Sequence, residues 1–213
     1  MQIAPLLHIG RGVTAIIGGG GKTTLLYTLT EELRKKGAVV LCTSTHILVP
    51  EQYPLVTGDA EELAAALREH GAVCAGTKAE DGKLTASPIS FAELARLADY
   101  VLVEADGARG LPLKRHAEHE PVVPDNASRV VLVVGADCFG RPLREVCHRA
   151  AEDELAAPAW VARHILAEGL GDRVFVNKVE SAEDYAAAQE LASYLDCPVV
   201  AGSLHMGVYT CLR

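Results

Sequence analysis

Four consecutive glycines, followed by a lysine and two threonines, make residues 18–24 the stretch whose chemistry is easiest to infer. Glycine permits a tight turn and lets the backbone approach an anion closely. The N–H groups of such a loop, and of the helix after it, point toward phosphate oxygens. In a loop of this kind Lys22 reaches the β- and γ-phosphates and the Thr23 hydroxyl binds Mg²⁺. We therefore predict that ATP or GTP binds with Mg²⁺ to Gly18, Gly19, Gly20, Gly21, Lys22, Thr23 and Thr24.

The glycine loop departs from the commonest phosphate-binding pattern. The pattern G-x-x-x-x-G-K-[ST] places a glycine where this chain has Ile16. The shorter loop resembles the G-x-x-G-K-T-T loop of Mur-type ligases. It also resembles the deviant loops of the MinD and nickel-chaperone class, although Ile17 stands in place of their first lysine. One alternative is a glycine-rich turn that binds no ligand; another is a dinucleotide-binding turn, in which Lys-Thr-Thr has no role.

Two acids end a strongly apolar segment at residues 100–106. A carboxylate opposite a phosphate-binding loop holds Mg²⁺, usually through water. Glu104 and Asp106 point the same way if the strand persists, so both are candidates for metal binding or for orienting a water. Arg109 adds a cation in the same loop, which makes Lys22, Glu104, Asp106 and Arg109 the predicted catalytic set. The alternative for Asp106 is a simple Asp-Gly turn.

Polar residues also follow the other apolar segments. Thr45 and His46 are candidates for substrate binding, with a Ser/Thr-rich turn and a surface histidine as alternatives. A locally basic stretch, residues 109–119, suggests a bound anion such as a γ-phosphate or an acidic second substrate, and Lys114 is its substrate candidate. The alternative is a solvated charged loop. Asp137 and Cys138 are further substrate candidates, although a lone cysteine is weak evidence for a site.

The sequence Asn177-Lys178-Val179-Glu180 resembles the N-K-x-D base-recognition motif of GTP-binding proteins. In that motif the Asn contacts the purine and the acid accepts hydrogen bonds from guanine. Glu180 is one carbon longer than the usual Asp, so a preference for guanine does not follow from the sequence. A polar loop between a strand and a helix is the alternative interpretation.

Apolar segments without polar alternation, separated by helical patterns, predict a parallel sheet covered on both faces. We therefore expect an α/β protein with a three-layer, P-loop NTPase-like fold in one domain, residues 1–213. A β-hairpin from 73–77 and 84–86 would form a small appendage around 73–88. The predicted strands are 13–17, 38–44, 100–104, 130–135, 174–177 and 199–201; the predicted helices are 22–36, 59–70, 90–98, 158–168 and 181–195.

Composition narrows the class of partner. The chain of 213 residues carries 20 basic and 28 acidic side chains, a net charge of −8, which argues against nucleic acid and against an anionic membrane surface. No apolar run reaches membrane-spanning length, and the first residues lack the features of a signal peptide. Six cysteines without a C-x-x-C pair suggest free thiols, so we expect a cytoplasmic protein.

Taken in order, these motifs resemble the selenium-dependent hydroxylase accessory proteins, also called the YqeC family. Residues 18–24, 43–46, 104–114, 120–124, 134–137 and 177–180 carry the resemblance. It implies a small cytoplasmic P-loop protein linked to the maturation of selenium-containing molybdenum hydroxylases, with that hydroxylase or its cofactor-maturation proteins as partners. It also implies that Lys22 and Thr23 serve phosphate and Mg²⁺, that Asp106 and Glu104 lie on the metal side, and that Thr45, His46, Arg109 and Lys114 are second-substrate candidates.

The motifs together predict a Mg²⁺-dependent nucleotide hydrolase, or an enzyme of nucleotidyl or phosphoryl transfer, that serves selenium or molybdenum cofactor assembly. One alternative is a Mur-type ATP-dependent ligase, suggested by the short loop. Another is a nucleotide-gated metallochaperone without catalysis of its own, with Cys138 and histidines as ligands. The last is a degenerate P-loop scaffold that binds nothing.

Overall fold

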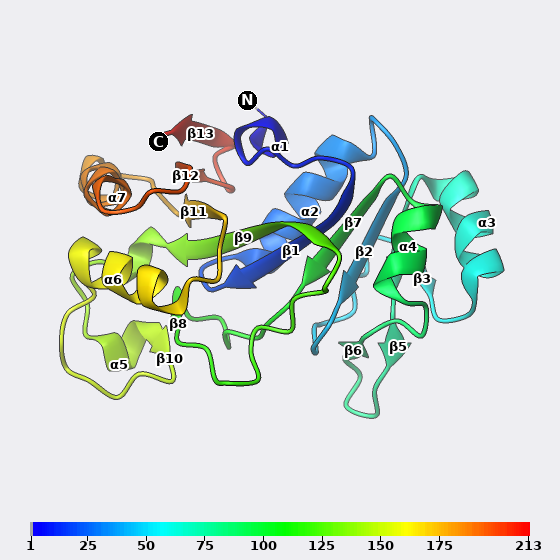
Figure 1. The fold of residues 1–213 in the computed structure, drawn as a ribbon, viewed down its shortest axis with the longest axis horizontal. Coiled ribbons are helices and arrows are strands. Elements are labelled where there is room, and N and C mark those ends of the chain that lie inside the picture. The colour runs from blue at the N-terminus through cyan, green and yellow to red at the C-terminus, as the bar shows by residue number, and fades with distance from the viewer. Residues whose placement is uncertain (1) are drawn as a thin grey trace.

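The computed structural model describes residues 2–213, which are built around one sheet of nine strands in the order β13-β12-β11-β9-β1-β7-β2-β4-β3 (Figure 1). All neighbouring strands in this sheet are parallel except β12 and β13. The strands are β1 (Gly12–Gly18), β2 (Val39–Thr43), β3 (Leu55–Val56), β4 (Ala72–Ala75), β7 (Tyr100–Glu104), β9 (Ala127–Gly135), β11 (Arg173–Asn177), β12 (Val199–Ser203) and β13 (Val208–Cys211).

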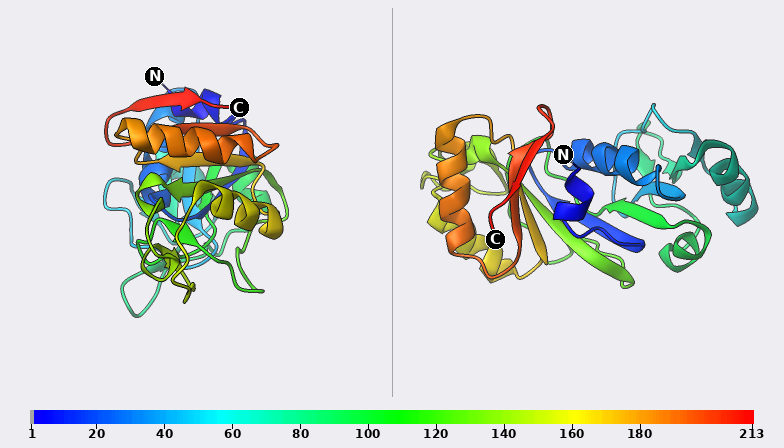
Figure 2. Two further views of the ribbon diagram at one scale, coloured as in Figure 1. Left: turned by 90° about the vertical axis from the view of Figure 1, so that its left-hand side faces the viewer. Right: turned by 90° about the horizontal axis from the view of Figure 1, so that it is seen from above.

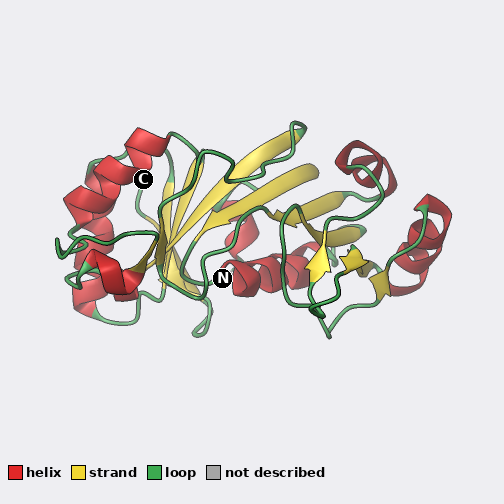
Figure 3. Ribbon diagram, turned by 90° about the horizontal axis from the view of Figure 1, so that it is seen from below, coloured by secondary structure: helices red, strands yellow, loops and turns green. Residues whose placement is uncertain are grey.

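Helices cover both faces of this twisted sheet (Figures 2 and 3). The side chains of α1 and α2 pack in one buried apolar cluster, and those of α3, α4, α6 and α7 pack in a second cluster on the opposite face. The predicted α/β class, a mostly parallel sheet with helices on both faces, is therefore confirmed. The helices are α1 (Ile3–Leu6), α2 (Lys22–Leu33), α3 (Ala60–His70), α4 (Phe91–Leu97), α5 (Leu143–Val146), α6 (Pro158–Glu168) and α7 (Ala182–Ser193), with a 3₁₀ turn, η1 (Ala136–Cys138).

Strand β1 shows why the central strands lack polar alternation. Successive side chains of a strand point to opposite faces. Val13, Ala15 and Ile17 join the cluster under α3, α4, α6 and α7, whereas Ile16 packs with α1 and α2. Because both faces are covered by helices, both sets of side chains must be apolar. Among residues 2–213, no helix has the length and apolar character to cross a lipid bilayer.

The predicted hairpin is wrong in one of its arms. Residues 72–75 form β4, which pairs in parallel with β2 inside the main sheet. The arms of the actual hairpin are β5 (Thr77–Lys78) and β6 (Leu84–Thr85), which pair antiparallel. The physical reason is burial: the side chains of β4 are all buried, whereas both residues of β5 are exposed.

The remaining differences between the predicted and the observed elements are at helix ends and in short elements. The first long helix ends at Leu33 rather than at residue 36. The short elements α1, β3, β13 and the small parallel pair β8 (Leu113–Lys114) and β10 (Cys147–His148) have too few residues for a periodic sequence signal.

Parallel pairing brings the carboxyl ends of eight strands to one edge of the sheet. Ile16 pairs in register with Glu104, and Asn177 with Gly135. The loop of residues 18–21 therefore lies between the ends of β7 and β9, with β2 and β11 beyond them. This edge, at the carboxyl ends of the strands, is where open α/β sheets bind ligands.

The position of Gly20 requires a glycine, because the loop backbone there lies close to the backbone of Gly135 at the end of β9. Its φ is +78°, and a Cβ atom added there would lie 2.2 Å from the backbone nitrogen of Gly135. We predict that Gly20→Ala lowers the free energy of unfolding by at least about 2 kcal/mol, because backbone strain and the overlap with Gly135 add. Urea denaturation followed by circular dichroism measures this change.

Gly10→Ala is the matched control, because a Cβ atom added at Gly10 would meet nothing within 4 Å and the backbone there has no positive φ. If Gly20→Ala and Gly10→Ala unfold at the same urea concentration, β9 does not constrain the loop as described.

Candidate functional site

The loop of residues 18–21 divides its backbone N–H groups between the protein and a potential anion. The N–H of Gly18 donates to Asp106 Oδ2 at 2.8 Å, that of Gly19 to the Val133 carbonyl, and that of Gly20 to the Leu111 carbonyl. The N–H groups of the first turn of α2 have no partner within the helix. We conclude that Gly18, Gly19 and Gly20 shape the loop, while the amides from Gly21 onward are the ones placed for phosphate.

Lys22 lies buried under this loop. Its Nζ donates to the Gly18 carbonyl at 2.8 Å and lies 3.1 Å from Asp106 Oδ1 and 3.7 Å from Glu104 Oε1. Among the described residues Asp106 Oδ1 has no hydrogen-bond donor, so its contact with Lys22 is an ion pair without hydrogen-bond alignment. The ammonium group is thus held by electrostatic attraction beside the place where phosphates would bind.

Thr23 and Glu104 form the hard-oxygen pair of the site. The Thr23 hydroxyl donates to Glu104 Oε2 at 2.9 Å. Burial raises the pKa of Glu104, although Lys22 and the Thr23 hydrogen bond act against this shift. A hydroxyl and a carboxylate are the donor types that Mg²⁺ binds together with nucleotide phosphates, so this pair fits the predicted metal. Asp106, also predicted as a metal ligand, has other partners.

Asp106 is closed off from solvent and serves as the centre of an ion network. His116 Nε2 lies 2.6 Å from Asp106 Oδ2, and His116 Nδ1 lies 2.7 Å from Glu168 Oε2 at the end of α6. Both ring nitrogens face carboxylates, so the geometry favours the doubly protonated imidazolium. Burial opposes charge on each group, but these hydrogen bonds outweigh it: the pKa of His116 is raised, and the pKa values of Asp106 and Glu168 are lowered.

Lys114 is also neutralised inside the protein. Its buried Nζ donates to the Gly107 carbonyl at 2.7 Å and pairs with Glu120 Oε2 at 2.9 Å. Arg149 pairs with the same carboxylate. Burial works against ionisation of Glu120, but Lys114 and Arg149 outweigh it and hold its pKa at about 2. The prediction that the basic stretch attracts a bound anion therefore needs correction for Lys114 and His116, because their anions are carboxylates of this chain.

The first of two clefts beside the loop has a volume of about 560 Å³. Asn177 forms its inner wall: the side-chain amide donates to the Gly20 carbonyl at 2.8 Å and its oxygen accepts from the Leu204 N–H at 3.1 Å. Asn177 thus ties the glycine loop to the loop after β12. The lining residues are Gly21, Thr24, Asp137, Asn177, Lys178, Glu180, Asp184, Ser203, Leu204 and His205.

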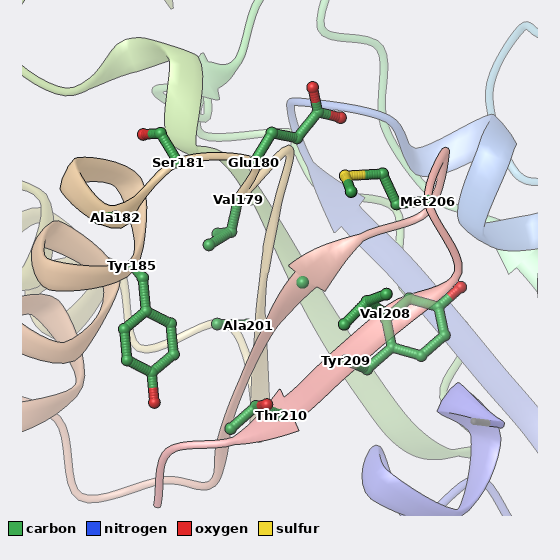
Figure 4. Close-up of a pocket in the computed structure, with 11 residues that line it drawn as sticks. Val179, Glu180, Ser181, Ala182, Tyr185, Ala201, Met206, Val208, Tyr209 and Thr210 are labelled. Carbon is green, nitrogen blue, oxygen red and sulfur yellow. The ribbon is translucent and has the colours of Figure 1, made fainter.

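The Glu180 carboxylate is oriented by a serine. Ser203 Oγ donates to Glu180 Oε1 at 2.8 Å. The two other acids of this cleft have protein partners: Asp137 pairs with Lys178 at 2.7 Å, and Asp184 caps the start of α7. Figure 4 shows the Glu180 carboxylate pointing away from Tyr185, which lines a smaller hollow beside β13. Glu180 is therefore an acceptor held in place in the first cleft.

The second cleft, of about 460 Å³, lies on the other side of Lys22 and Thr23. Its walls come from the segment after β2, from the β5–β6 hairpin and from the loop after β7. Glu104, Lys22 and Thr23 belong to its floor. The outer lining includes His46, Ile47, Leu48, Lys83, Arg109 and Gly110.

The structure separates the predicted substrate residues. His46 and Arg109 line the second cleft, whereas Asp137 lines the first. Thr45 packs against Thr43, whose hydroxyl lies 3.4 Å from the Thr45 hydroxyl. Cys138 is completely buried, and burial raises the pKa of its thiol, so it faces neither cleft and offers no ligand to a soft metal there. The metallochaperone hypothesis named Cys138 as a metal ligand, and the burial of this thiol argues against that role.

Several residues of the site lie outside the sequence prediction. Glu168 lies at the end of a surface helix and reaches His116 only through packing. Ser203 could have been found from the sequence, because it is a polar residue at the end of an apolar strand, at the carboxyl edge of the sheet. Lys83 lies in the hairpin, which joins the site because Ile47 and Leu84 exchange two backbone hydrogen bonds. No short-range pattern connects residues 47 and 84.

Comparison with known proteins gives a family and a distant structural neighbour. The model of the YqeC protein family matches residues 14–151. The Escherichia coli (strain K12) protein titled "Uncharacterized protein YqeC" is 37% identical over 136 residues, which are 60% of this chain and 53% of that protein. The chain thus spans about half the length of this relative. The crystal structure of the signal recognition particle 54 kDa protein from Aeropyrum pernix K1 with GDP aligns with 95% of this chain and 44% of its own, at 19% identity and a TM-score of 0.44.

The buried Asp106–His116–Glu168 network predicts a pH-dependent contribution to stability. A histidine whose pKa is raised by folding stabilises the fold fully below its unfolded pKa of about 6.5, and this contribution is lost as pH rises through the folded pKa. We expect His116→Gln to lower the free energy of unfolding by about 3 kcal/mol near pH 6, and by less at pH 9. Denaturant titrations across this range measure the difference.

His119→Gln, at an exposed position in the same loop, is the control and should change stability little at either pH. A His116→Gln deficit that stays constant from pH 6 to pH 9 would contradict the ionised network.

Proposed function

This chain belongs to the YqeC family, and on that premise we propose that it binds a nucleoside triphosphate with Mg²⁺ and cleaves it, by hydrolysis or by phosphoryl or nucleotidyl transfer. The observation that carries the proposal is the position of Lys22. It lies beneath the glycine loop, at the start of α2, next to the Thr23–Glu104 pair. The Lys22 ammonium group, the free N–H groups of α2 and the Thr23–Glu104 pair thus meet at the start of α2.

The residues of the chain would act mainly by electrostatics. The N–H groups of Gly21 and the first turn of α2 bind phosphate oxygens. Lys22 turns from Asp106 toward the phosphates, and Asp106 keeps its charge balance through His116. Mg²⁺ bound by Thr23 and Glu104 would neutralise charge on the phosphate group being transferred. Arg109, exposed in the second cleft, is the additional cation available to that group.

We propose that this activity serves the maturation of selenium-containing molybdenum hydroxylases. The support for this role is the motif resemblance across the chain and membership of the YqeC family. The partners would be the hydroxylase or its cofactor-maturation proteins, and the compartment the cytoplasm. The Mur-type ligase alternative shares the short loop and the carboxylates, and the two are distinguished by trapping an acyl phosphate.

The proposed base is guanine. An ionised carboxylate only accepts hydrogen bonds, and guanine presents two donors, N1–H and the N2 amino group, on one edge. Glu180 is held by Ser203 and is the one acid of the first cleft without a cation or helix-cap partner among residues 2–213. Adenine offers an acceptor at N1, which a carboxylate repels. Asn177 supports this proposal, because its contacts join the glycine loop to Leu204 in the same cleft that Glu180 lines.

Replacing Lys22 tests the phosphate site. We expect Lys22→Ala to weaken Mg²⁺-nucleotide binding by about tenfold to a hundredfold, because a charged hydrogen-bond donor to phosphate is lost. Titration of a fluorescent nucleotide with and without Mg²⁺ measures the affinity, and circular dichroism verifies folding. Lys36→Ala, an exposed lysine beyond α2, is the control. Unchanged affinity in Lys22→Ala would support the scaffold that binds nothing.

Replacing Glu180 tests the base. In competition titrations we expect GTP to bind the wild-type protein more tightly than ATP, and Glu180→Gln to reduce that preference by about tenfold, since one acceptor becomes a donor. Glu183→Gln removes the same charge from an exposed position on α7 and should leave the preference intact. Equal binding of ATP and GTP by the wild-type protein would refute the assignment of guanine.

A further inference from the structure

We propose that the second cleft binds a small anionic second substrate, carrying a carboxylate or phosphate group, beside the terminal phosphate of the nucleotide. This inference rests on the proposed function and specifies the substrate class of the same site. It depends on two cations, Lys83 and Arg109, that reach the cleft from separate segments. Lys83 has no part in the proposed nucleotide site, and Arg109 would contact both the transferred phosphate and the second anion.

Arg109 is held at the tip of a turn fastened to the glycine loop. The Leu111 N–H donates to the Ala108 carbonyl, and the Leu111 carbonyl accepts from the Gly20 N–H. Arg109 and Gly110, the two central residues of the turn, have φ values of +51° and +77°. A non-glycine residue in this conformation is uncommon and carries strain. The turn therefore fixes the Arg109 backbone relative to the phosphate site.

The guanidinium group of Arg109 is exposed on the cleft and has no hydrogen bond or ion pair with any of residues 2–213. Three other basic residues of the same loop have carboxylate partners: Lys114 pairs with Glu120, Arg115 with Glu152, and His116 with Asp106. The fold thus holds the backbone of Arg109 under strain and leaves its charge available to a ligand.

Lys83 reaches the opposite wall through the hairpin. The Ile47 N–H donates to the Leu84 carbonyl at 3.0 Å, and the Leu84 N–H donates to the Ile47 carbonyl at 2.8 Å. This pairing places Lys83 beside His46 at the cleft. Lys83 Nζ lies 3.1 Å from Asp81, but both side chains are about half exposed. An exposed ion pair of this kind contributes little, so an anionic ligand can compete for the lysine.

The remaining lining limits the kind of molecule that fits. Leu48 is 75% exposed at the cleft, although it is a large apolar side chain. Glu104 on the floor is partnered by Thr23 and Lys22, so it leaves the outer part of the cleft positive. The cleft of about 460 Å³ extends from Lys22 and Thr23 on its floor to these outer residues, so it covers both the expected position of the terminal phosphate and the space beside it. The cleft therefore suits a small molecule with an oxyanion and a short apolar portion that covers Leu48.

An oxyanion in this position makes group transfer the reaction of the site. The acceptor oxygen forms a bond to the γ-phosphorus as the bond from that phosphorus to the β–γ bridging oxygen breaks. The electron pair of the broken bond leaves with the nucleoside diphosphate. Arg109 and Lys83 would hold the acceptor against the repulsion of the triphosphate, which is the obstacle to bringing two anions together.

In the experiment that tests this inference, a nucleotide analogue first fills the phosphate site, so that the probes report on the second cleft. The full chain is saturated with Mg²⁺ and a non-hydrolysable GTP or ATP analogue, and inorganic phosphate and malonate are titrated in separate calorimetric experiments. We expect at least one probe to bind, and the tighter of the two identifies a phosphate or carboxylate preference. Lys83→Ala and Arg109→Asn should each weaken that binding by roughly tenfold. Asn is chosen because it tolerates positive φ and so preserves the turn.

Lys78→Ala is the matched control, since Lys78 is an exposed lysine of the same hairpin that does not line the cleft. It removes the same charge and should leave probe binding unchanged. If the analogue binds but neither probe does at up to about 10 mM, which corresponds to negligible affinity, this inference is overturned while the proposed function stands. It is also overturned if all three variants weaken binding equally. An analogue that fails to bind overturns the proposed function and this inference with it.

Discussion

The ion network centred on Asp106 holds the glycine loop, and the rest of the site depends on it. This buried carboxylate accepts the Gly18 N–H, attracts Lys22 and is bonded to His116. A charge without access to water is costly unless it is paired and hydrogen-bonded, so each member of the network fixes the others. Within the described residues 2–213, each charge of this network thereby has an opposite charge beside it, and Lys22 lies directly under the glycine loop.

The network also couples distant segments. His116 links Asp106 to Glu168 at the end of α6, and Lys114 links the Gly107 carbonyl to Glu120. These links fasten the long loop after β7 against the body of the protein. The same loop supplies Leu111, which accepts the Gly20 N–H, and Arg109, which faces the second cleft. Arg109 and the internally paired Lys114 and His116 thus lie in one segment, and only the tertiary contacts tell them apart.

In the proposed function, the two clefts would hold different molecules, the nucleotide base in one and the second substrate in the other. The first lies beside β11 and β12 and is lined by Glu180, the proposed base acceptor; the second lies beside β2 and β7 and is lined by Lys83 and Arg109, the proposed oxyanion-binding cations. The glycine loop and Thr23 lie between them. This order follows from the parallel sheet, which places the end of β1 between its neighbours β9 and β7.

The sequence by itself determined the α/β class and the positions of the glycine loop, Glu104 and Asn177 at the carboxyl edge of the sheet, because apolar periodicity, glycine content and position at a strand end are local features. It did not determine the ion-pair partners of Lys114 and His116 or the burial of Cys138. The first two neutralise internal carboxylates and the third is buried, since charge pairing and burial depend on residues far away in the chain. Only the folded structure joins Leu84 to Ile47 and Ser203 to Glu180, because strand pairing and packing set those contacts.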